Sequence, residues 1–326
     1  MHFDRILSRH SNETLRKVCV HCGIGTKSRK GDLIECIRDG INFLDLIPKN
    51  MRLLSMDMGM KNLSCCRIEQ SDILEKPFLK KRNWKKLDLH EVYGKRYKAI
   101  SKDLLSLFES QRYQSYLAFE LLNDLVIKRK KEPDVDIIVL EHQRTRSNGL
   151  RATLPNVMTN FTFEHMLNSS FYTLQQFMPQ LSSAMILPMS SGKMMNFWVN
   201  RFLDERKKSL HLDTKKMRNQ LVFDWFCAED PPFRHDLCLP PEFSKLTSLQ
   251  KSRCLLQELG LASNRNKIDD LVDSFLYAMT CHKNLQNIYK LKEWLVSDRK
   301  LEDFVTKLEE EQFELVRDTL SRTTLN

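Results

Sequence analysis

The sequence predicts an α/β fold in which a mixed central sheet is flanked by helices. Three observations indicate this class. Two apolar segments, residues 53–58 and 63–68, are separated only by the turn-forming residues 59–62, as in a pair of antiparallel strands. Residues 137–140 are continuously apolar, which is typical of a strand buried on both faces of a sheet. Between these segments, large apolar side chains recur at helical spacing over residues 97–126.

The first 48 residues are expected to form a small helical unit. Leu15 and Val18, and later Leu33 and Ile37, fall at helical spacing, and the glycine-bearing residues 23–30 separate the two periods. Two helices of this length are too short to be stable alone, so they must pack on each other or on the rest of the chain. We therefore expect either a separate module over residues 1–48 or a helical cap on the main domain.

This segment resembles a SAP motif, the helix, extended turn and helix module that binds duplex DNA through its backbone. The resemblance is carried by Gly23, Thr26, Lys30 and Leu33. It implies a SAP-like DNA-binding module over residues 1–48, in which the connector contacts DNA. The residues expected to make that contact are Lys27, Arg29 and Lys30.

Residues 49–326 have the element order of one large α/β domain. The expected elements are strands at 53–58, 63–68 and 84–89, a helix at 97–126, a strand at 137–140, a helix at 157–177, a strand at 184–187 and a helix at 266–284. Three strands in a row, then helix, strand, helix, strand and further helices is the order of an RNase H-like fold. We therefore predict an RNase H-like domain over residues 49–326.

Composition favours a soluble protein with a polyanionic partner. The 326 residues include 52 Lys and Arg against 42 Asp and Glu, a formal net charge of +10, which favours nucleic acid as the partner. No stretch approaches the ~20 apolar residues that cross a bilayer, so we expect no membrane role. The nine scattered cysteines fit free thiols better than a disulfide framework. The N-terminus, MHFDRILSRH, lacks the apolar core of a secretory signal and leaves targeting open.

Five acidic residues occupy positions where a carboxylate is unexpected. Asp57 ends the first strand and Glu141 ends the strand at 137–140. The other three, Asp269, Asp270 and Asp273, begin a helix whose opposite face is apolar. A partly buried carboxylate is costly unless it is paired or bound to a cation. If the strand ends are neighbours and the helix packs over them, the carboxylates converge, and such oxygen ligands select Mg²⁺, with Mn²⁺ as a substitute.

A cluster of this kind predicts phosphodiester hydrolysis. Two ions about 4 Å apart would activate a water and stabilise the leaving oxygen, so the five acids are candidate metal ligands and catalytic residues. Each acid also has an ordinary explanation by itself. Asp57 can be a turn residue, Glu141 an ion-pair partner of a following arginine, and Asp269 a helix N-cap or first-turn acid. Only their conjunction favours a metal site.

Three segments carry a family resemblance: SMDMGMKNLS, VLEHQRTRS and KIDDLVDSFLY, in that order. Together they resemble the fungal mitochondrial Holliday junction resolvases, cruciform-cutting relatives of bacterial RuvC. The resemblance covers nearly the whole chain and implies a Mg²⁺-dependent endonuclease that cuts opposing strands of four-way junctions in mitochondrial DNA recombination. It implies Asp57, Glu141 and Asp273 as metal ligands. Spacing does not decide whether Asp269 or Asp270 is the fourth, although the i, i+4 relation to Asp273 favours Asp269.

The resemblance also implies a DNA surface beside the acids, a homodimer and a mitochondrial location. The residues expected on that surface are Lys61, Gln143, Arg144, Arg146 and Arg151. Because a four-way junction has near two-fold symmetry, a homodimer with two equal sites fits it. Recognition through shape and phosphates implies binding that weakens steeply with salt. Neither a nucleotide cofactor nor a membrane partner is expected.

Alternatives stay open at this point. The acids also fit a related nuclease acting on other nucleic-acid structures, and without catalysis the chain would be a junction-binding or DNA-binding protein. A nucleotide-binding relative would need a second glycine-rich loop and a duplicated domain, whereas this chain has nine glycines and no duplication. The helically spaced Phe161, Phe163 and Phe171 are interpreted as core residues, with dimer or junction-wedge contacts as the alternative.

Overall fold

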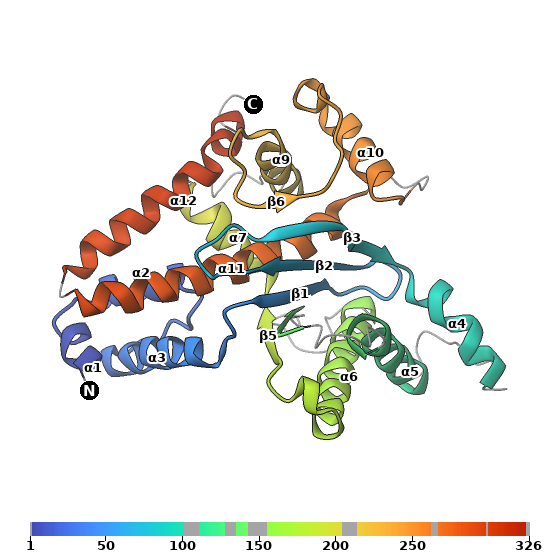
Figure 1. Cartoon of the computed structure of the whole chain (residues 1–326), viewed down its shortest axis with the longest axis horizontal. Coiled ribbons are helices and arrows are strands. Elements are labelled where there is room, and N and C mark those ends of the chain that lie inside the picture. Colours follow the sequence, from blue (N-terminus) through green and yellow to red (C-terminus); the bar gives the residue numbers. More distant parts are fainter. Residues whose placement is uncertain are drawn as a thin grey trace.

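Figure 1 shows the fold, a computed structural model that describes residues 2–100, 111–127, 135–142, 155–203, 214–261, 267–297 and 299–323. A six-stranded mixed sheet lies at the centre, in the order β5-β4-β1-β2-β3-β6. The strands are β1 (Met51–Asp57), β2 (Leu63–Gln70), β3 (Phe78–Leu87), β4 (Ile137–Glu141), β5 (Met185–Met189) and β6 (Arg234–His235). β1, β2 and β3 are antiparallel neighbours, while β4 pairs in parallel with β1 and with β5. The predicted α/β class with a mixed sheet is confirmed.

Helices cover both faces of the sheet (Figure 1). They are α1 (His2–Leu7), α2 (Asn12–His21), α3 (Lys30–Phe43), α4 (Leu89–Ile100), α5 (Gln111–Leu122), α6 (Pro155–Phe177), α7 (Ser191–Trp198), α9 (Thr214–Cys227), α10 (Ser248–Glu258), α11 (Asp269–Val296) and α12 (Leu301–Thr323). Successive residues of β1 alternate between the two faces, as the pleat requires. Leu53 joins the core that includes α11, and Leu54 joins the core that includes α5 and α6. The sheet is therefore buried between two hydrophobic layers.

The structure corrects several predicted boundaries. The third strand begins at Phe78 rather than at residue 84, because a register shift between Cys66 and Ile68 of β2 allows the pairing to continue to Leu79, which is fully buried. Helical structure begins at Leu89 in α4, well before the predicted start of the long helix, and it resumes in α5. β6 was not predicted, because a strand of two residues carries no periodicity.

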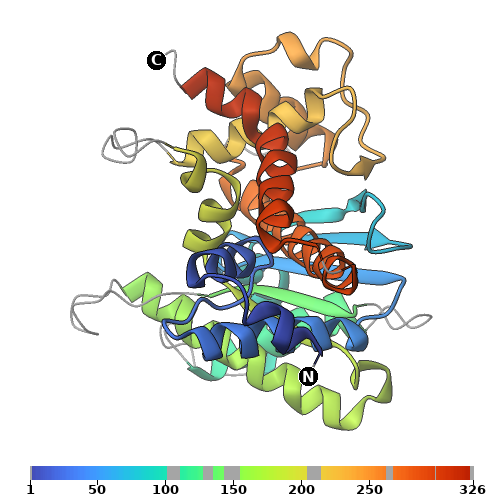
Figure 2. The same cartoon turned by 90° about the vertical axis from the view of Figure 1, so that its left-hand side faces the viewer.

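The two predicted N-terminal helices are present as α2 and α3, and they pack on the far half of α11 and on α12 (Figures 1 and 2). Their apolar residues belong to the same core as α11. The hydroxyl of Thr14 donates to Glu302 of α12 at 3.0 Å, and Asn287 Nδ2 of α11 donates to the carbonyl of His21 at 2.7 Å. Gly23, at φ +66°, lies where an added Cβ would be 2.1 Å from Asn284 Nδ2. The division into a module over 1–48 and a domain over 49–326 stays a prediction.

Other sequence-based expectations concern single side chains. All nine cysteines are free thiols, and burial raises the pKa of Cys19 to about 12. Phe163 and Phe171 are fully buried in the core between the sheet and α5–α6, so their interpretation as core residues is confirmed. Phe161 is partly exposed and packs on the ring of His165, with centroids 4.3 Å apart. Within the described ranges, no helix has the length and apolar character of a membrane span.

Candidate active site

The ends of β1 and β4 bring two of the predicted acids together. The parallel pairing of Met56 with Leu140 makes Asp57 and Glu141 the next residues along adjacent strands, on the face that α11 covers. The two carboxyl groups share a hydrogen bond, and Glu141 Oε2 also accepts from the backbone N–H of Met58 at 3.2 Å. Burial and then the nearby charge of Glu141 raise the pKa of Asp57 well above its usual value. The predicted meeting of these strand ends is present.

Three serines let α11 approach the sheet closely. Ser55 Oγ of β1 donates to the carbonyl of Ser274 at 2.5 Å, and the hydroxyls of Ser64 in β2 and Ser274 are 2.8 Å apart. Trp84 Nε1 of β3 donates to the carbonyl of Leu271 at 2.9 Å. Because small side chains line this contact, the first turns of α11 lie directly over the strand ends. These anchors fix where the acids of α11 stand.

Asp270 and Asp273 lie within electrostatic range of the strand acids. Both of their charges contribute to the raised pKa of Asp57. Burial raises the pKa of Asp273 itself to about 7, with further increases from Glu141, Asp269 and Asp270, against the opposing effect of the Arg218 guanidinium. Asp273 Oδ1 is buried and has no hydrogen-bond partner among the described residues. The helix acids and the strand acids therefore form one interacting group.

Cationic and amide side chains from two other elements contact the acids of α11. Arg218 of α9 forms an ion pair with Asp273. Asn219 Nδ2 donates to Asp269 Oδ1 at 3.0 Å, and Lys86 Nζ of β3 lies 2.5 Å from Asp270 Oδ2. A second α9 cation, Lys215, lies 3.6 Å from Asp269 Oδ2.

Sequence reasoning did not predict these contacts, because the spacing of residues within one helix does not show which distant residues it meets. A usable signal was present. Arg218 shares a helical face with Leu221, Val222 and Trp225, all of which are buried, and a cation on an apolar face needs a buried acidic partner.

The donor set suits a hard divalent cation, although the acids are not arranged as a ready-made cage. All five side chains offer carboxylate oxygens, and the raised pKa values of Asp57 and Asp273 indicate a shortage of positive charge around them. Within the described part of the chain, no three acidic, histidine or cysteine side chains are placed to hold a metal ion. Both candidates for the fourth acid are contacted by a lysine, and they differ in that the charge of Asp270 acts on Asp57 whereas Asp269 accepts from Asn219.

The predicted DNA-contacting residues fall into three groups. Gln143, Arg144, Arg146 and Arg151 lie outside the described residues. Lys61 is exposed in the turn between β1 and β2, directly after the strand end that carries Asp57. Lys27 and Arg29 are exposed in the connector between α2 and α3, and Lys30 donates to the carbonyl of Ser8 at 2.7 Å. The structure thus places Lys61 close to the acids and the connector residues beside the second half of α11.

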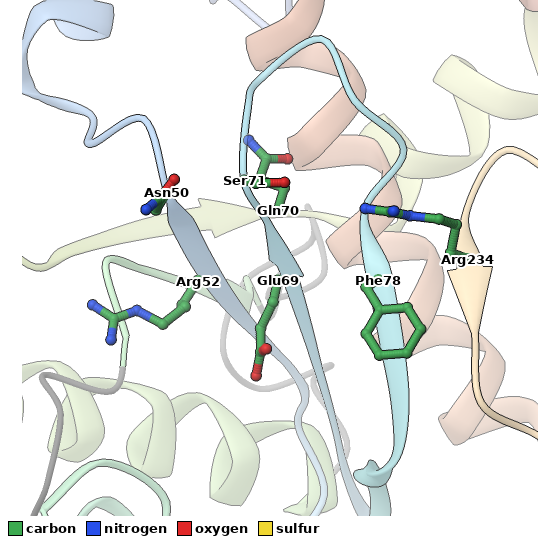
Figure 3. A pocket seen from close by; sticks show the side chains of 7 residues that line it. All are labelled: Asn50, Arg52, Glu69, Gln70, Ser71, Phe78 and Arg234. Carbon is green, nitrogen blue, oxygen red and sulfur yellow. The ribbon is translucent and has the colours of Figure 1, made fainter.

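A pocket of about 730 Å³ has none of the five acids in its lining, which Figure 3 shows. A single cross-strand row contributes Arg52, Glu69, Phe78 and Arg234, at the end of the sheet opposite Asp57. Its charges are already paired, since Arg52 binds Asp136 at 3.2 Å and Glu69 binds Lys80. The charged groups of this pocket are therefore engaged within the protein.

Comparison with known proteins agrees with this arrangement. A family model described as "Mitochondrial resolvase Ydc2 / RNA splicing MRS1" matches residues 53–291, a segment that contains all five acids and Arg218. A solved structure, the crystal structure of the yeast mitochondrial Holliday junction resolvase Ydc2, is similar over 88% of this chain and 98% of its own, with a TM-score of 0.56 and 21% sequence identity. No curated protein matches the chain. The predicted RNase H-like fold is confirmed by the structural likeness.

Proposed function

Because this chain belongs to the family of the mitochondrial resolvase Ydc2 and the RNA-splicing protein MRS1, we propose that it is a mitochondrial nuclease that resolves four-way (Holliday) DNA junctions. The observation that carries the proposal is the convergence of Asp57, Glu141 and the acids of α11 at one end of the sheet. A DNA-binding protein without catalysis has no need for such a cluster, since buried carboxylates of like charge destabilise the fold. The cluster therefore favours the nuclease over the alternatives.

We propose Asp57, Glu141, Asp270 and Asp273 as the groups that would hold Mg²⁺ or Mn²⁺. The bound cations would activate a water molecule and stabilise the leaving oxygen of the phosphodiester. The protein's own contribution is positioning: the strand ends fix Asp57 and Glu141, and the serine contacts of α11 fix Asp273 against them. Asp269, held by Asn219, then supports the first turn of the helix.

The surface around this cluster suits the backbone of DNA. Lys61 lies in the turn that follows β1, Lys86 lies near the end of β3 and contacts Asp270, and Lys215 of α9 contacts Asp269. Phosphate contacts of this type position a substrate without reading its sequence, so junction recognition would depend on branched shape. Salt should weaken binding steeply.

The N-terminal helices are proposed as the site of a second DNA contact. Gly23 touches Asn284 of α11, eleven residues beyond Asp273, which corresponds to roughly 16 Å along the helix axis. The exposed Lys27 and Arg29 follow in the same connector. A DNA arm that leaves the cut site would therefore reach Lys27 and Arg29 within about one turn of the duplex, ~34 Å. This fits the proposed SAP-like role of residues 1–48.

A homodimer is proposed because paired cuts in opposing strands need two equal sites. The described surface of α5 and α6 exposes three large aromatic side chains, Phe119, Tyr172 and Phe177, with Phe177 at 79% exposure. Exposed aromatics of this kind are enriched where proteins associate. They support this face as the place to test for self-association, by sedimentation of the wild type and of a Tyr172→Ser, Phe177→Ser variant.

The function is tested by offering the full chain four substrates with Mg²⁺: a four-way DNA junction, a linear DNA duplex, a DNA single strand and a folded RNA. We expect cleavage of the junction only. Equal cleavage of the linear duplex would indicate a nuclease of another specificity. Binding without cleavage of any substrate, or preferential binding of the folded RNA, would favour the non-catalytic or RNA-directed alternative over a junction resolvase.

A further inference from the structure

Arg218 is a buried cation placed inside the carboxylate cluster. The whole residue is 8% exposed, and it lies on the face of α9 that also buries Leu221, Val222 and Trp225. Its guanidinium pairs with Asp273, and its Nε donates to the carbonyl of Thr214 at 3.3 Å. A buried arginine is costly unless a charge and hydrogen bonds compensate it. The position of Arg218 is thus determined by the acids, and the apolar part of its side chain packs in the core.

The other cations at the cluster are more accessible. The side chain of Lys86, on Asp270, is 21% exposed, and that of Lys215, on Asp269, is 65% exposed, against 10% for Arg218. Solvent screens the two lysines, whereas the Arg218–Asp273 pair is largely shielded from it. Arg218 is therefore the cation that most directly offsets the charge of the acid nearest to it.

Only one of the two Asp273 oxygens is used by this pair. Oδ2 is bound by Arg218, while Oδ1 is buried without a hydrogen-bond partner among the described residues. A second cation brought to Asp273 would be repelled by the guanidinium at such close range. Pairing of Asp273 with Arg218 and binding of Asp273 to a metal ion therefore compete.

We propose that Arg218 is a positioning residue that takes the place of the divalent cation: in the metal-free protein it neutralises Asp273, and on metal binding it releases that carboxylate to the ion. This inference rests on the proposed metal-dependent function. The arginine keeps the site assembled until the metal arrives.

The affinity for metal tests this inference, because the two roles of Arg218 predict opposite changes in that affinity when the arginine is replaced. Titration calorimetry of the full chain with Mn²⁺ should give a dissociation constant for Arg218→Gln about tenfold lower than for the wild type, because a competing charge is removed. Lys215→Gln, which removes an equal charge from the exposed side of the same helix, should change it by less than about threefold. Equal or weaker Mn²⁺ binding by Arg218→Gln would overturn the inference, since a purely structural role predicts a loss.

A measurement on the wild type keeps the test valid if the variant does not fold. Phenylglyoxal modifies accessible guanidinium groups, and mass spectrometry can follow Arg218 individually. We expect Mn²⁺ to increase the modification rate of Arg218 at least about threefold relative to EDTA, while Arg317, on the exposed face of α12, is unchanged. An unchanged rate at Arg218 would overturn the release of the arginine.

The outcomes separate this inference from the proposed function. If the wild type cuts junctions with metal but Arg218→Gln binds Mn²⁺ no more tightly, the function stands and the role of Arg218 is refuted. If Arg218→Gln binds Mn²⁺ more tightly but the wild type cuts no junction, the role of Arg218 stands and the function is refuted.

Discussion

The two ends of α11 serve different purposes within one continuous helix (Figure 1). At its start, Asp269, Asp270 and Asp273 are held by ion pairs with α9 and β3. In its second half, the buried side chains of Asn287 and Ile288 pack against the N-terminal helices. The first end carries excess negative charge that a ligand can relieve, whereas the second is held by apolar packing and by the hydrogen bond from Asn287 to His21. Changes at the first end should therefore affect chemistry, and changes at the second should affect stability or DNA arm binding.

The largest expected effect is at the acidic end. Replacing Asp57 by Asn should reduce junction cleavage by a factor on the order of a thousand, because the carboxylate serves the metal and the transition state. Junction binding in Ca²⁺ should remain within about twofold, since the acid makes no contribution to phosphate binding. Gel-shift and single-turnover assays check both. Cleavage by this variant at the wild-type rate would show that the site lies elsewhere.

A substitution at the opposite end should act on the fold instead. Gly23→Ala forces a residue with φ +66° and a Cβ into the Asn284 side chain, so we expect a loss of about 2 kcal/mol in the free energy of unfolding. Gly25→Ala is the matched control, because nothing lies within 4 Å of its added Cβ. Urea unfolding measures both variants. If Gly23→Ala were as stable as Gly25→Ala, the described docking of the N-terminal helices on α11 would be wrong.

The charge at the acidic end should also give a pH signature in EDTA. Burial raises the pKa of Asp273 to about 7 in the fold despite the opposing effect of Arg218, against about 3.9 when unfolded, so between these values the folded state holds a proton that the unfolded state has lost, and the ion pair with Arg218 is complete only above about pH 7. The contribution of Asp273 to stability therefore falls as pH rises through this window. The melting temperature of the wild type, relative to Asp273→Asn, should drop by roughly 3 °C from about pH 4 to about pH 7. A rise in that difference would contradict the assignment.

The smallest effect is expected in the connector of the N-terminal helices. Lys27→Gln and Arg29→Gln should each weaken junction binding a few-fold and lower the salt slope by about one. Glu35→Gln, on the exposed surface of α3, is the matched control. Cleavage at saturating protein should be unchanged, because the connector is far from the acids. Salt slopes equal to the wild type would remove residues 1–48 from the DNA contact.

The main features of the fold and of the acid cluster could be predicted from the sequence, because they depend on the local spacing of apolar residues. Apolar runs placed Asp57 and Glu141 at the ends of two strands, and helical spacing placed Asp270 and Asp273 on one helix, whereas the pairing of the two strands was only assumed and is shown by the structure. The contacts that complete the site depend on distant parts of the chain. Arg218 reaches Asp273 only because α9 packs on α11, and spacing within α9 indicates that Arg218 needs an acidic partner without showing which one.

The same limit explains why the sequence analysis favoured Asp269 over Asp270 as the fourth metal ligand. The i, i+4 relation favoured Asp269, but which side of α11 faces the strand ends is set by Ser55, Ser64 and Ser274. Serines on strands carry no periodic signal of a close helix contact. The structure supplied that contact and shows that the charge of Asp270 acts on Asp57, which is why Asp270 is proposed.

The central claim is that the acidic end of α11 forms the metal site of a junction-resolving nuclease. Its most direct test labels each strand of a four-way junction in turn and maps the cuts made by the wild type with Mg²⁺ or with EDTA. We predict nicks at equivalent positions in two opposing strands, with Mg²⁺ only. Cuts confined to one strand, cuts in all four strands, or cutting that persists in EDTA would contradict the claim.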